Sequence, residues 1–164
     1  MNRSDITTMV AYNFWANKRI ISACEGLKGG EFTRAVIPDP GWGSLQGILV
    51  HMMDVEFGWR SNIMGLDASK IFQPVDYPDV AKLKAGWAVE EKAWLDFLAE
   101  QDDESINRVF REENSSRIIV WQTIMHVMMH SMQHRSEAAY ILTGYGQSPG
   151  ELDFGIYLSK FRAE

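Results

Sequence analysis

The sequence predicts an all-α protein, an antiparallel four-helix bundle with long connections, and three observations support this fold class. Apolar residues recur at spacings of three and four along four long stretches. Glycine and proline clusters separate these stretches, and nothing between them has the pattern of a long strand. With 164 residues, 46% of them hydrophobic, the chain has the size of one compact domain, so we expect a single domain over residues 1–164.

Capping and breaker residues set the ends of the predicted helices, which cover residues 4–27, 44–64, 79–101 and 120–142. Ser4, Ser44 and Asp79 are the expected N-caps, because their side chains can accept a hydrogen bond from the first helical turn. Gly29 and Gly65 are expected to end the first two helices. The stretch GYGQSPG closes the last one.

Residues 104–119 interrupt the helical pattern. Ile106, Val109 and Phe110 lie on one side of the polar stretch REENSSR, and Ile118 and Ile119 lie on the other. We expect this segment to form a short β-hairpin before the last long helix, with the polar stretch as its turn. The tail ELDFGIYLSKF is expected to pack against the bundle or to cap it.

Charge and composition exclude several classes of protein. The net charge is −6 and the lysines and arginines are scattered, so we expect no nucleic-acid partner. No apolar run approaches the roughly 18 to 20 residues that cross a bilayer, so we expect no membrane partner. The single cysteine, Cys24, cannot form an intrachain disulfide, and no secretion signal is evident, which favours the cytoplasm. Cys24 is interpreted as a core residue rather than a nucleophile.

Three of the four histidines lie four residues apart in HVMMHSMQH, at His126, His130 and His134. At 100° per residue they fall within about 80° of one another, so we expect all three to point into the bundle. A buried imidazole nitrogen without a partner costs about 1 to 3 kcal/mol. His51, in the middle of the second predicted helix, is also expected to face inward. One histidine from that helix and an i, i+4 pair from the last would form a metal site with open coordination positions.

The residues alone leave the ligand pair and the metal open. Four helical residues rise about 6 Å and eight rise about 12 Å, so His126 and His134 cannot easily share one ion, and His130 can pair with either. Zinc, nickel, iron and copper all accept imidazole nitrogen. Asp54 and Glu137 each follow a histidine by about one turn. Either carboxylate could orient a ligand ring or take a proton from water, or be an ordinary surface group.

Two further sets of side chains have alternative interpretations. The outer face of the last helix is expected to carry four apolar side chains, which a second copy of the chain in a homodimer or the chain's own tail would cover: Met125, Met128, Met132 and Ala139. Four tryptophans are expected either to fill the core, which we favour for most of them, or to line a ligand cavity: Trp15, Trp42, Trp59 and Trp121.

Four stretches, in this order along nearly the whole chain, resemble the DinB/YfiT-like family of metalloenzymes: YNFWANKRI, SLQGILVHMMDVEFGWR, HVMMHSMQHR and GYGQSPGELDFGIYL. The resemblance implies an up-down-down-up bundle, often dimeric, that holds one divalent metal ion with three histidines. In the family pattern these ligands correspond to His51, His130 and His134, with His126 as a neighbour. Zinc or nickel is the expected metal, and iron is a further candidate.

The resemblance also implies a chemistry. Family members of known activity include transferases and isomerases that use a low-molecular-weight thiol such as bacillithiol or mycothiol. We therefore expect a metal-dependent thiol transferase, or a hydrolase, acting on a small molecule, and the alternative is a non-catalytic metal-binding or structural bundle. Where the family usually has HRGQ, this chain has His134, Arg135, Ser136 and Glu137, so a carboxylate replaces an amide.

Overall fold

The computed structural model of the protein describes residues 1–36, 42–113 and 116–160. Four long helices form the body of the molecule: α1 (Arg3–Cys24), α2 (Leu45–Met64), α3 (Val80–Ala99) and α5 (Val120–Gly144). The shorter elements are η1 (Pro74–Asp76), α4 (Asp103–Asn107), β1 (Val109–Glu113), β2 (Ser116–Ile119) and α6 (Phe154–Lys160). The chain is therefore mostly helical, as the periodicity predicts.

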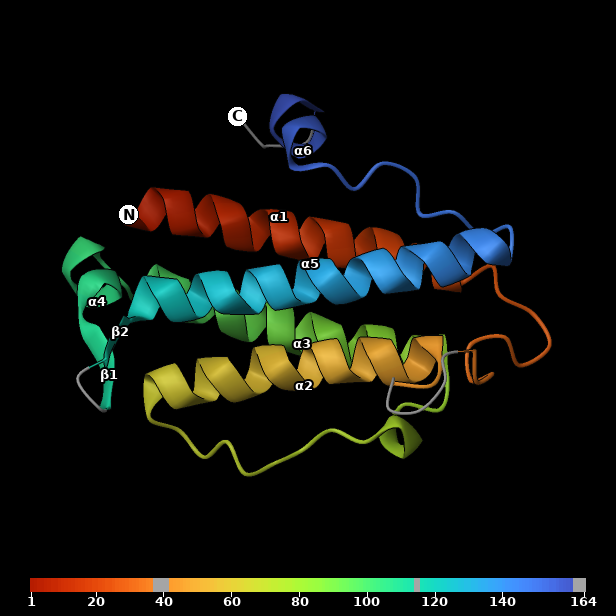
Figure 1. Cartoon of the computed structure of the whole chain (residues 1–164), viewed down its shortest axis with the longest axis horizontal. Helices are drawn as coiled ribbons and strands as arrows, with labels where there is room; N and C mark the ends of the chain where they lie inside the picture. Colours follow the sequence, from red (N-terminus) through yellow and green to blue (C-terminus); the bar gives the residue numbers. More distant parts are fainter. Residues whose placement is uncertain (37–41, 114–115, 161–164) are drawn as a thin grey trace.

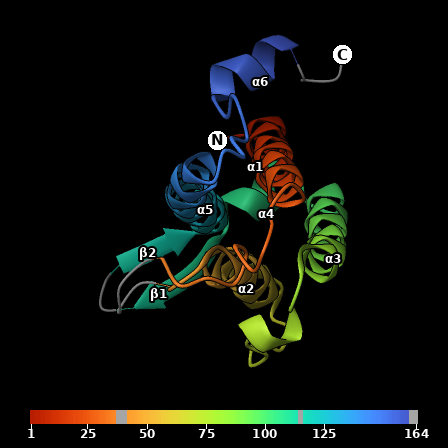
Figure 2. The ribbon, with the colours of Figure 1, turned by 90° about the vertical axis from the view of Figure 1, so that its right-hand side faces the viewer.

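The long helices run up, down, down and up. In Figure 1, α1 and α5 run in one direction, and α2 and α3 run in the other. The connection between α2 and α3, which includes η1, returns along the length of the bundle. Seen end-on, the four helices occupy four corners, with α2 between α5 and α3 (Figure 2). The predicted bundle with long connections is confirmed.

Two of the three predicted N-caps are confirmed, and one is wrong. The side chains of Ser44 and Asp79 accept hydrogen bonds from the first turns of α2 and α3. The first helix is capped by Asn2 instead of Ser4. The Asn2 side chain accepts from the Asp5 N–H at 2.9 Å, while the Asp5 carboxylate accepts from the Asn2 N–H at 3.3 Å. This reciprocal capping box explains the earlier start, because Ser4 has no acidic residue at the matching position.

The β-hairpin is confirmed, but its bounds differ from the prediction. β1 and β2 pair antiparallel, with Arg111 opposite Ile118. The polar residues 111–113 belong to β1 and not to the turn. Ile106 lies in α4 and is fully buried. Asp102 caps this short helix, since its carboxylate accepts from the Ser105 N–H at 2.8 Å, and the predicted strand therefore starts later.

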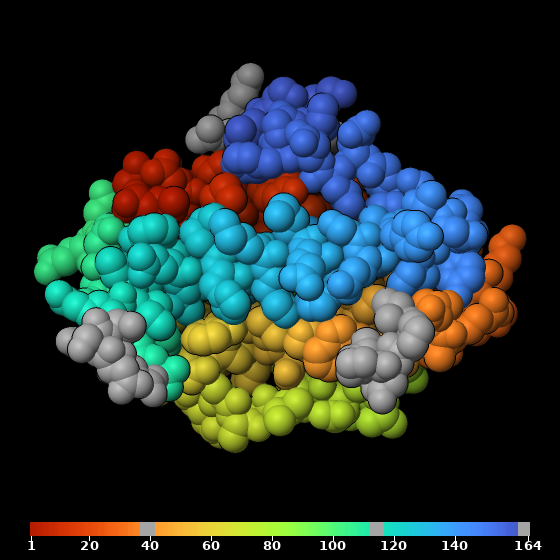
Figure 3. Space-filling view, viewed as in Figure 1, coloured from red at the N-terminus to blue at the C-terminus, as the bar shows by residue number. Residues whose placement is uncertain are grey.

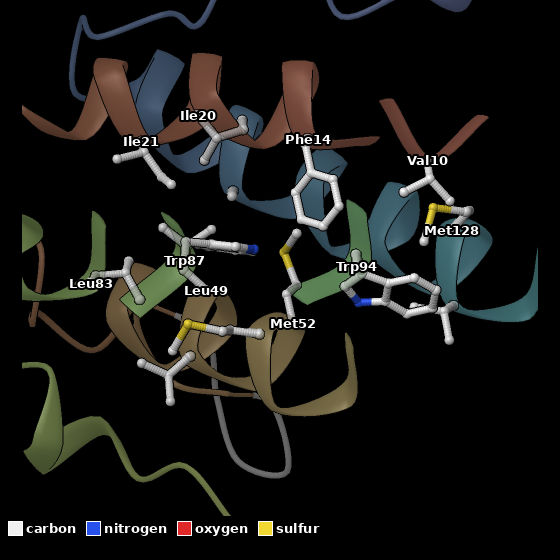
Figure 4. Close-up of a cluster of buried hydrophobic side chains, with 14 of the residues drawn as sticks. Val10, Phe14, Ile20, Ile21, Leu49, Met52, Leu83, Trp87, Trp94 and Met128 are labelled. Carbon is white, nitrogen blue, oxygen red and sulfur yellow. The ribbon is translucent and has the colours of Figure 1, made fainter. Parts of the chain in front are cut away.

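Large apolar side chains from all four long helices fill the core. Figure 4 shows Phe14, Met52, Trp87 and Trp94 packed between α1, α2 and α3, with Met128 from α5 nearby. Met128 is only 4% exposed, so its expected place on the outer face is wrong. The reason is that α5 packs against both α1 and α2, which covers a wide arc of its surface.

The other residues assigned to the outer face of α5 divide between core and surface. Met132 is exposed, as is its neighbour Met129, whereas Met125 and Ala139 are partly buried against the core. The tail helix α6 packs on α1 through Tyr157 and Tyr12, as expected for the C-terminal segment (Figure 2). Among the described residues, none of the helices combines the length and the apolar character needed to cross a membrane.

Cys24 is 1% exposed within the main core, so its interpretation as a core residue is confirmed. Burial and the charge of neighbouring Glu25 raise the pKa of the Cys24 thiol to about 12. The reactive thiolate is therefore strongly disfavoured at neutral pH.

Candidate metal centre

Three histidines from two helices meet where α2 and α5 pack side by side. Figure 3 shows the face of the molecule on which both of these helices are visible. His51 comes from α2, and His130 and His134 come from consecutive turns of α5. The ring centroids are 4.9 Å apart for His51 and His130, 5.0 Å for His51 and His134, and 4.5 Å for the two rings of α5. One nitrogen from each ring lies within 4.8 Å of the other two. We call these three residues the histidine triad.

The donor atoms of the triad fit a single metal ion. The Nε2 atoms of His51 and His130 are 3.1 Å apart. Two nitrogens bound to one tetrahedral ion at about 2.1 Å would be about 3.4 Å apart. His134 Nδ1 lies 2.7 Å from a carboxylate oxygen of Glu137, which assigns its proton to Nδ1 and leaves an unprotonated Nε2. A cation can accept the lone pairs of all three nitrogens. Without a cation, the three nitrogens cannot all be paired by hydrogen bonds to one another, because each is either a donor or an acceptor.

Two rings of the triad, those of His51 and His130, favour the neutral form that binds metal. Burial, with smaller effects from His130 and His134, lowers the pKa of His51 from 6.5 to about 4. Burial also lowers the pKa of His130 to about 4, together with the neighbouring His134 and His126, while Glu137 opposes the shift. Both rings are therefore unprotonated at neutral pH, with a lone pair available for a ligand bond.

The two carboxylates that follow histidines in sequence have different partners. The Glu137 Oε2 accepts the hydrogen bond from His134 Nδ1, and this type of contact fixes the orientation of a ligand ring and increases its basicity. The hydrogen bond of Asp54 is to the backbone and not to the ring of His51. The Asp54 Oδ1 accepts from the backbone N–H of Phe72 at 2.7 Å and so holds the connection between α2 and α3.

His126 does not share the site, and the expectation that it points into the bundle is wrong. Its side chain is exposed, and its ring centroid lies 6.3 Å from that of His130. At this level of the bundle, Trp59 of α2 approaches α5, and its ring centroid is 5.5 Å from that of His126. The geometry thus brings together His130 and His134, the pair that the family resemblance implies.

One tryptophan lies directly on the triad. The indole of Trp42 stacks on the imidazole of His51, with ring centroids 3.6 Å apart and planes inclined by 14°. Trp15 instead packs with the tyrosines of α1 and α6, and Trp121 packs against the main core. The interpretation as an aromatic wall therefore suits Trp42, and the filler interpretation suits Trp15 and Trp121.

The arginines closest in sequence to the site are held elsewhere. Arg60 makes a two-pronged ion pair with Glu90, at 2.7 and 2.9 Å. Arg135 is 2% exposed and donates to the side-chain oxygens of Asn13 and Asn17. Both guanidinium groups are engaged in buried pairs, so neither is free to bind the carboxylates of a thiol cofactor.

A second buried polar cluster surrounds Glu56, and sequence reasoning did not identify it. We call it the Glu56 cluster: Asn13, Asn17, Glu56, Ser131 and Arg135. Glu56 lies in α2, and its charged side chain is fully buried. The signal in the sequence was the spacing of Asn13 and Asn17, which places two amides on one face of α1.

A comparison with known protein families matches residues 1–161 to the DinB family. The chain belongs to the DinB family. A search of curated proteins found no match. In this DinB protein, the nitrogens of the triad lie close enough together to hold a metal ion. A search of the described residues for such groups of histidine, cysteine and acidic side chains found the triad.

Proposed function

We propose that this DinB protein binds one divalent metal ion through His51, His130 and His134 and uses it as an enzyme acting on a small molecule. The observation that carries the proposal is the convergence of one nitrogen from each ring within 4.8 Å. Three protein ligands leave at least one position of a tetrahedral shell for a substrate or water, which distinguishes catalytic from structural sites. Zinc and nickel suit three imidazoles best, and iron is a further candidate.

The proposed reaction is a thiol transfer or a hydrolysis. When bound, the ion would supply Lewis-acid activation of a low-molecular-weight thiol or of a water. In the transfer, the sulfur would form a bond to an electrophilic carbon as the leaving group departs with its electron pair. The chain's own contribution is to lower the pKa of His51 and His130, which favours their neutral rings, and to orient His134 through the hydrogen bond from its Nδ1 to Glu137.

Two surface features support further parts of the proposal. A hollow of about 780 Å³ borders Glu137 and is large enough for a small-molecule substrate. Its walls are formed by Val36, Tyr140, Ile141 and Tyr145.

On α5, Met129 and Met132 are 58% and 52% exposed, which supports a homodimer that covers them. Light scattering at micromolar concentration tests the dimer, and a monomeric mass would reject it. A cytoplasmic location remains part of the proposal because the single cysteine is unpaired.

Metal analysis tests the ligand assignment. We expect untagged protein to carry about one ion per chain and His130→Ala to lose it, because two imidazoles bind far more weakly than three. His126→Ala is the matched control, since it removes an imidazole from the same helix one turn away without touching the triad. Unchanged metal content in His130→Ala would contradict the assignment.

One observation favours a second candidate function, a bundle whose histidines do not serve catalysis. The 3.1 Å contact between the Nε2 atoms of His51 and His130 also fits a direct N–H···N hydrogen bond. A panel of thiols and electrophiles, assayed with and without the metal, separates the two candidates. Metal-dependent turnover that His130→Ala abolishes supports the enzyme, and metal binding without turnover across the panel supports the binding protein.

A further inference from the structure

We infer that Trp42 is a positioning residue of the metal centre, whose indole holds the His51 ring in its ligand orientation and stabilises the metal-bound form. The inference rests on the proposed metal site. It concerns a residue of the loop before α2 that itself offers no ligand atom.

The geometry of the stack leaves the ligand atom of His51 accessible. The two rings lie face to face, with centroids 3.6 Å apart. A face contact does not cover the ring edge, and the Nε2 of His51 on that edge remains 3.1 Å from the Nε2 of His130. The indole also meets His134 nearly edge-on, at 6.5 Å and 83°. Trp42 thus contacts ligand rings from both helices of the site.

The backbone around Trp42 is built for a close approach to α2. The Trp42 carbonyl accepts from the Ser44 N–H at 2.9 Å, and Gly43 between them has a left-handed φ of 74°. A Cβ atom on Gly47 would lie 2.0 Å from the Trp42 oxygen, so only glycine allows this contact. Gly47 is one helical turn before His51. The loop and the helix are therefore shaped together to place the indole on that imidazole.

Burial distinguishes Trp42 from the tryptophans that fill the core. Trp42 is 48% exposed, whereas Trp94 is 0% and Trp87 is 3% exposed. A tryptophan stabilises a fold mainly by burying its large apolar surface, and half of that benefit is absent here. Among the described residues, the aromatic rings that Trp42 meets are those of His51 and His134. Its position is explained by the triad and not by the core.

The stack should be stronger in the metal-bound form than in the empty one. When His51 donates a lone pair to a divalent cation, its imidazole gains positive character. The indole face carries negative charge density and attracts a positively charged group placed over it. A contact that favours the loaded state over the empty state raises metal affinity. The stack also restricts the rotamers of His51 before metal binds, which reduces the ordering that binding requires.

Zinc affinity measured by competition with a chelator tests the inference in four variants. We expect Trp42→Ala and Trp42→Leu to bind zinc about 10-fold more weakly, the scale seen when a contact that orients a ligand is lost. Trp42→Phe keeps an aromatic face and should stay within about threefold of wild type. The matched control is Trp121→Ala, which truncates a tryptophan of α5 that packs against the main core and not on the triad. The denaturation midpoint of the metal-free protein is measured in all four variants, so that a loss of stability is distinguished from a loss of zinc affinity.

A second readout follows the indole directly. Nickel quenches tryptophan fluorescence at short range, and we expect Trp42→Phe to lose most of the quenching although five other tryptophans remain. Wild-type zinc affinity in Trp42→Ala would overturn the inference and leave the metal site intact. Wild-type affinity in Trp42→Leu would also overturn it, because bulk and not the aromatic face would then suffice. If wild-type protein binds no metal, the proposed function fails first, and the inference fails with it.

Discussion

The Glu56 cluster and the histidine triad occupy the same bundle but differ in how completely their polar atoms are paired. Glu56 Oε1 accepts hydrogen bonds from Asn13, Asn17 and Ser131 at 2.7 to 3.1 Å, and its Oε2 accepts from the Trp87 indole at 3.0 Å. The side-chain oxygens of both asparagines accept from the buried Arg135. Helices α1, α2, α3 and α5 all contribute to this network.

The triad is only partly paired. His130 Nδ1 is buried and has no hydrogen-bond partner within the part of the chain that the structure describes. One nitrogen of each ring lies within 4.8 Å of the other two, and the Nε2 atoms of His51 and His130 are 3.1 Å apart. A buried polar network can stabilise a fold by itself when every polar atom in it has a hydrogen-bond partner. A cluster in which a buried polar atom has no such partner needs a further group, such as a bound ion, to pair with it. This difference supports a stabilising role for the Glu56 cluster and the metal-binding role that we propose for the triad.

The largest expected effect comes from neutralising the Glu56 cluster. In Glu56→Gln, the negative charge that stabilises the Arg135 guanidinium is lost, and an amide N–H replaces one of the two acceptors. A buried donor or acceptor left without its partner costs about 1 to 3 kcal/mol, and more where the group is charged, so several such losses in one cluster give about 3 kcal/mol or more. We expect a loss of that size in the free energy of unfolding of the metal-free protein, measured with urea.

The matched control for this experiment is Glu91→Gln. Glu91 forms an ion pair with Lys18, whose side chain is 64% exposed, so its loss should cost less than about 1 kcal/mol. Equal losses in Glu56→Gln and Glu91→Gln would remove the structural role that we assign to the Glu56 cluster.

Metal addition should have the next largest effect, and it should act through the triad alone. Zinc at 100 times its dissociation constant would stabilise the folded state by about 2.7 kcal/mol. For a chain of this length we expect the melting temperature to rise by roughly 5 to 10 °C. A chelator should reverse the rise, His130→Ala should abolish it, and His126→Ala should retain it. A rise that persists in His130→Ala would show that the ion binds elsewhere.

Glu137→Gln should have a smaller effect on metal affinity. The amide oxygen can still accept from His134 Nδ1, but without the charge that increases the basicity of the ring. We expect zinc to bind about 10-fold more weakly, measured by chelator competition. Asp54→Asn is the control, because Asp54 bonds to the backbone N–H of Phe72 and not to the triad. If both variants bind zinc equally, Glu137 does not support the site.

The fold and the candidate histidines could be predicted because their signals are local, whereas the choice of His134 over His126 came from the family resemblance. The repeat of apolar residues and the caps at Ser44 and Asp79 define three helices almost to the residue. Four-residue spacing alone put His126 on the same face as His130. The spacing could not show that the His126 ring would be exposed, beside Trp59 from another helix.

Contacts between distant parts of the chain could not be predicted from the sequence. The sequence around Glu56 does not indicate that amides from α1, a hydroxyl from α5 and an indole from α3 surround its carboxylate. Trp42 is nine positions from His51, and its stacking depends on a left-handed glycine and on the missing Cβ of Gly47. Such placements depend on the three-dimensional packing of loops and helices, which hydrophobic periodicity does not encode.

The smallest expected effect is a dependence of metal-free stability on pH that comes from His51 and His130. The folded-state pKa values of His51 and His130 are lowered from 6.5 to about 4, so between these values the unfolded chain binds more protons. Their contribution to stability is complete above pH 6.5 and is lost as the pH falls toward 4. Urea titrations at pH 7 and pH 5 should therefore differ less in His130→Ala than in wild type. His126→Ala should stay closer to wild type, because His126 lowers the pKa of His130 less than burial and His134 do. The difference should be modest because the rings are half-buried and partly screened by water. Identical pH dependence in His130→Ala and wild type would mean that the triad does not titrate as its burial requires.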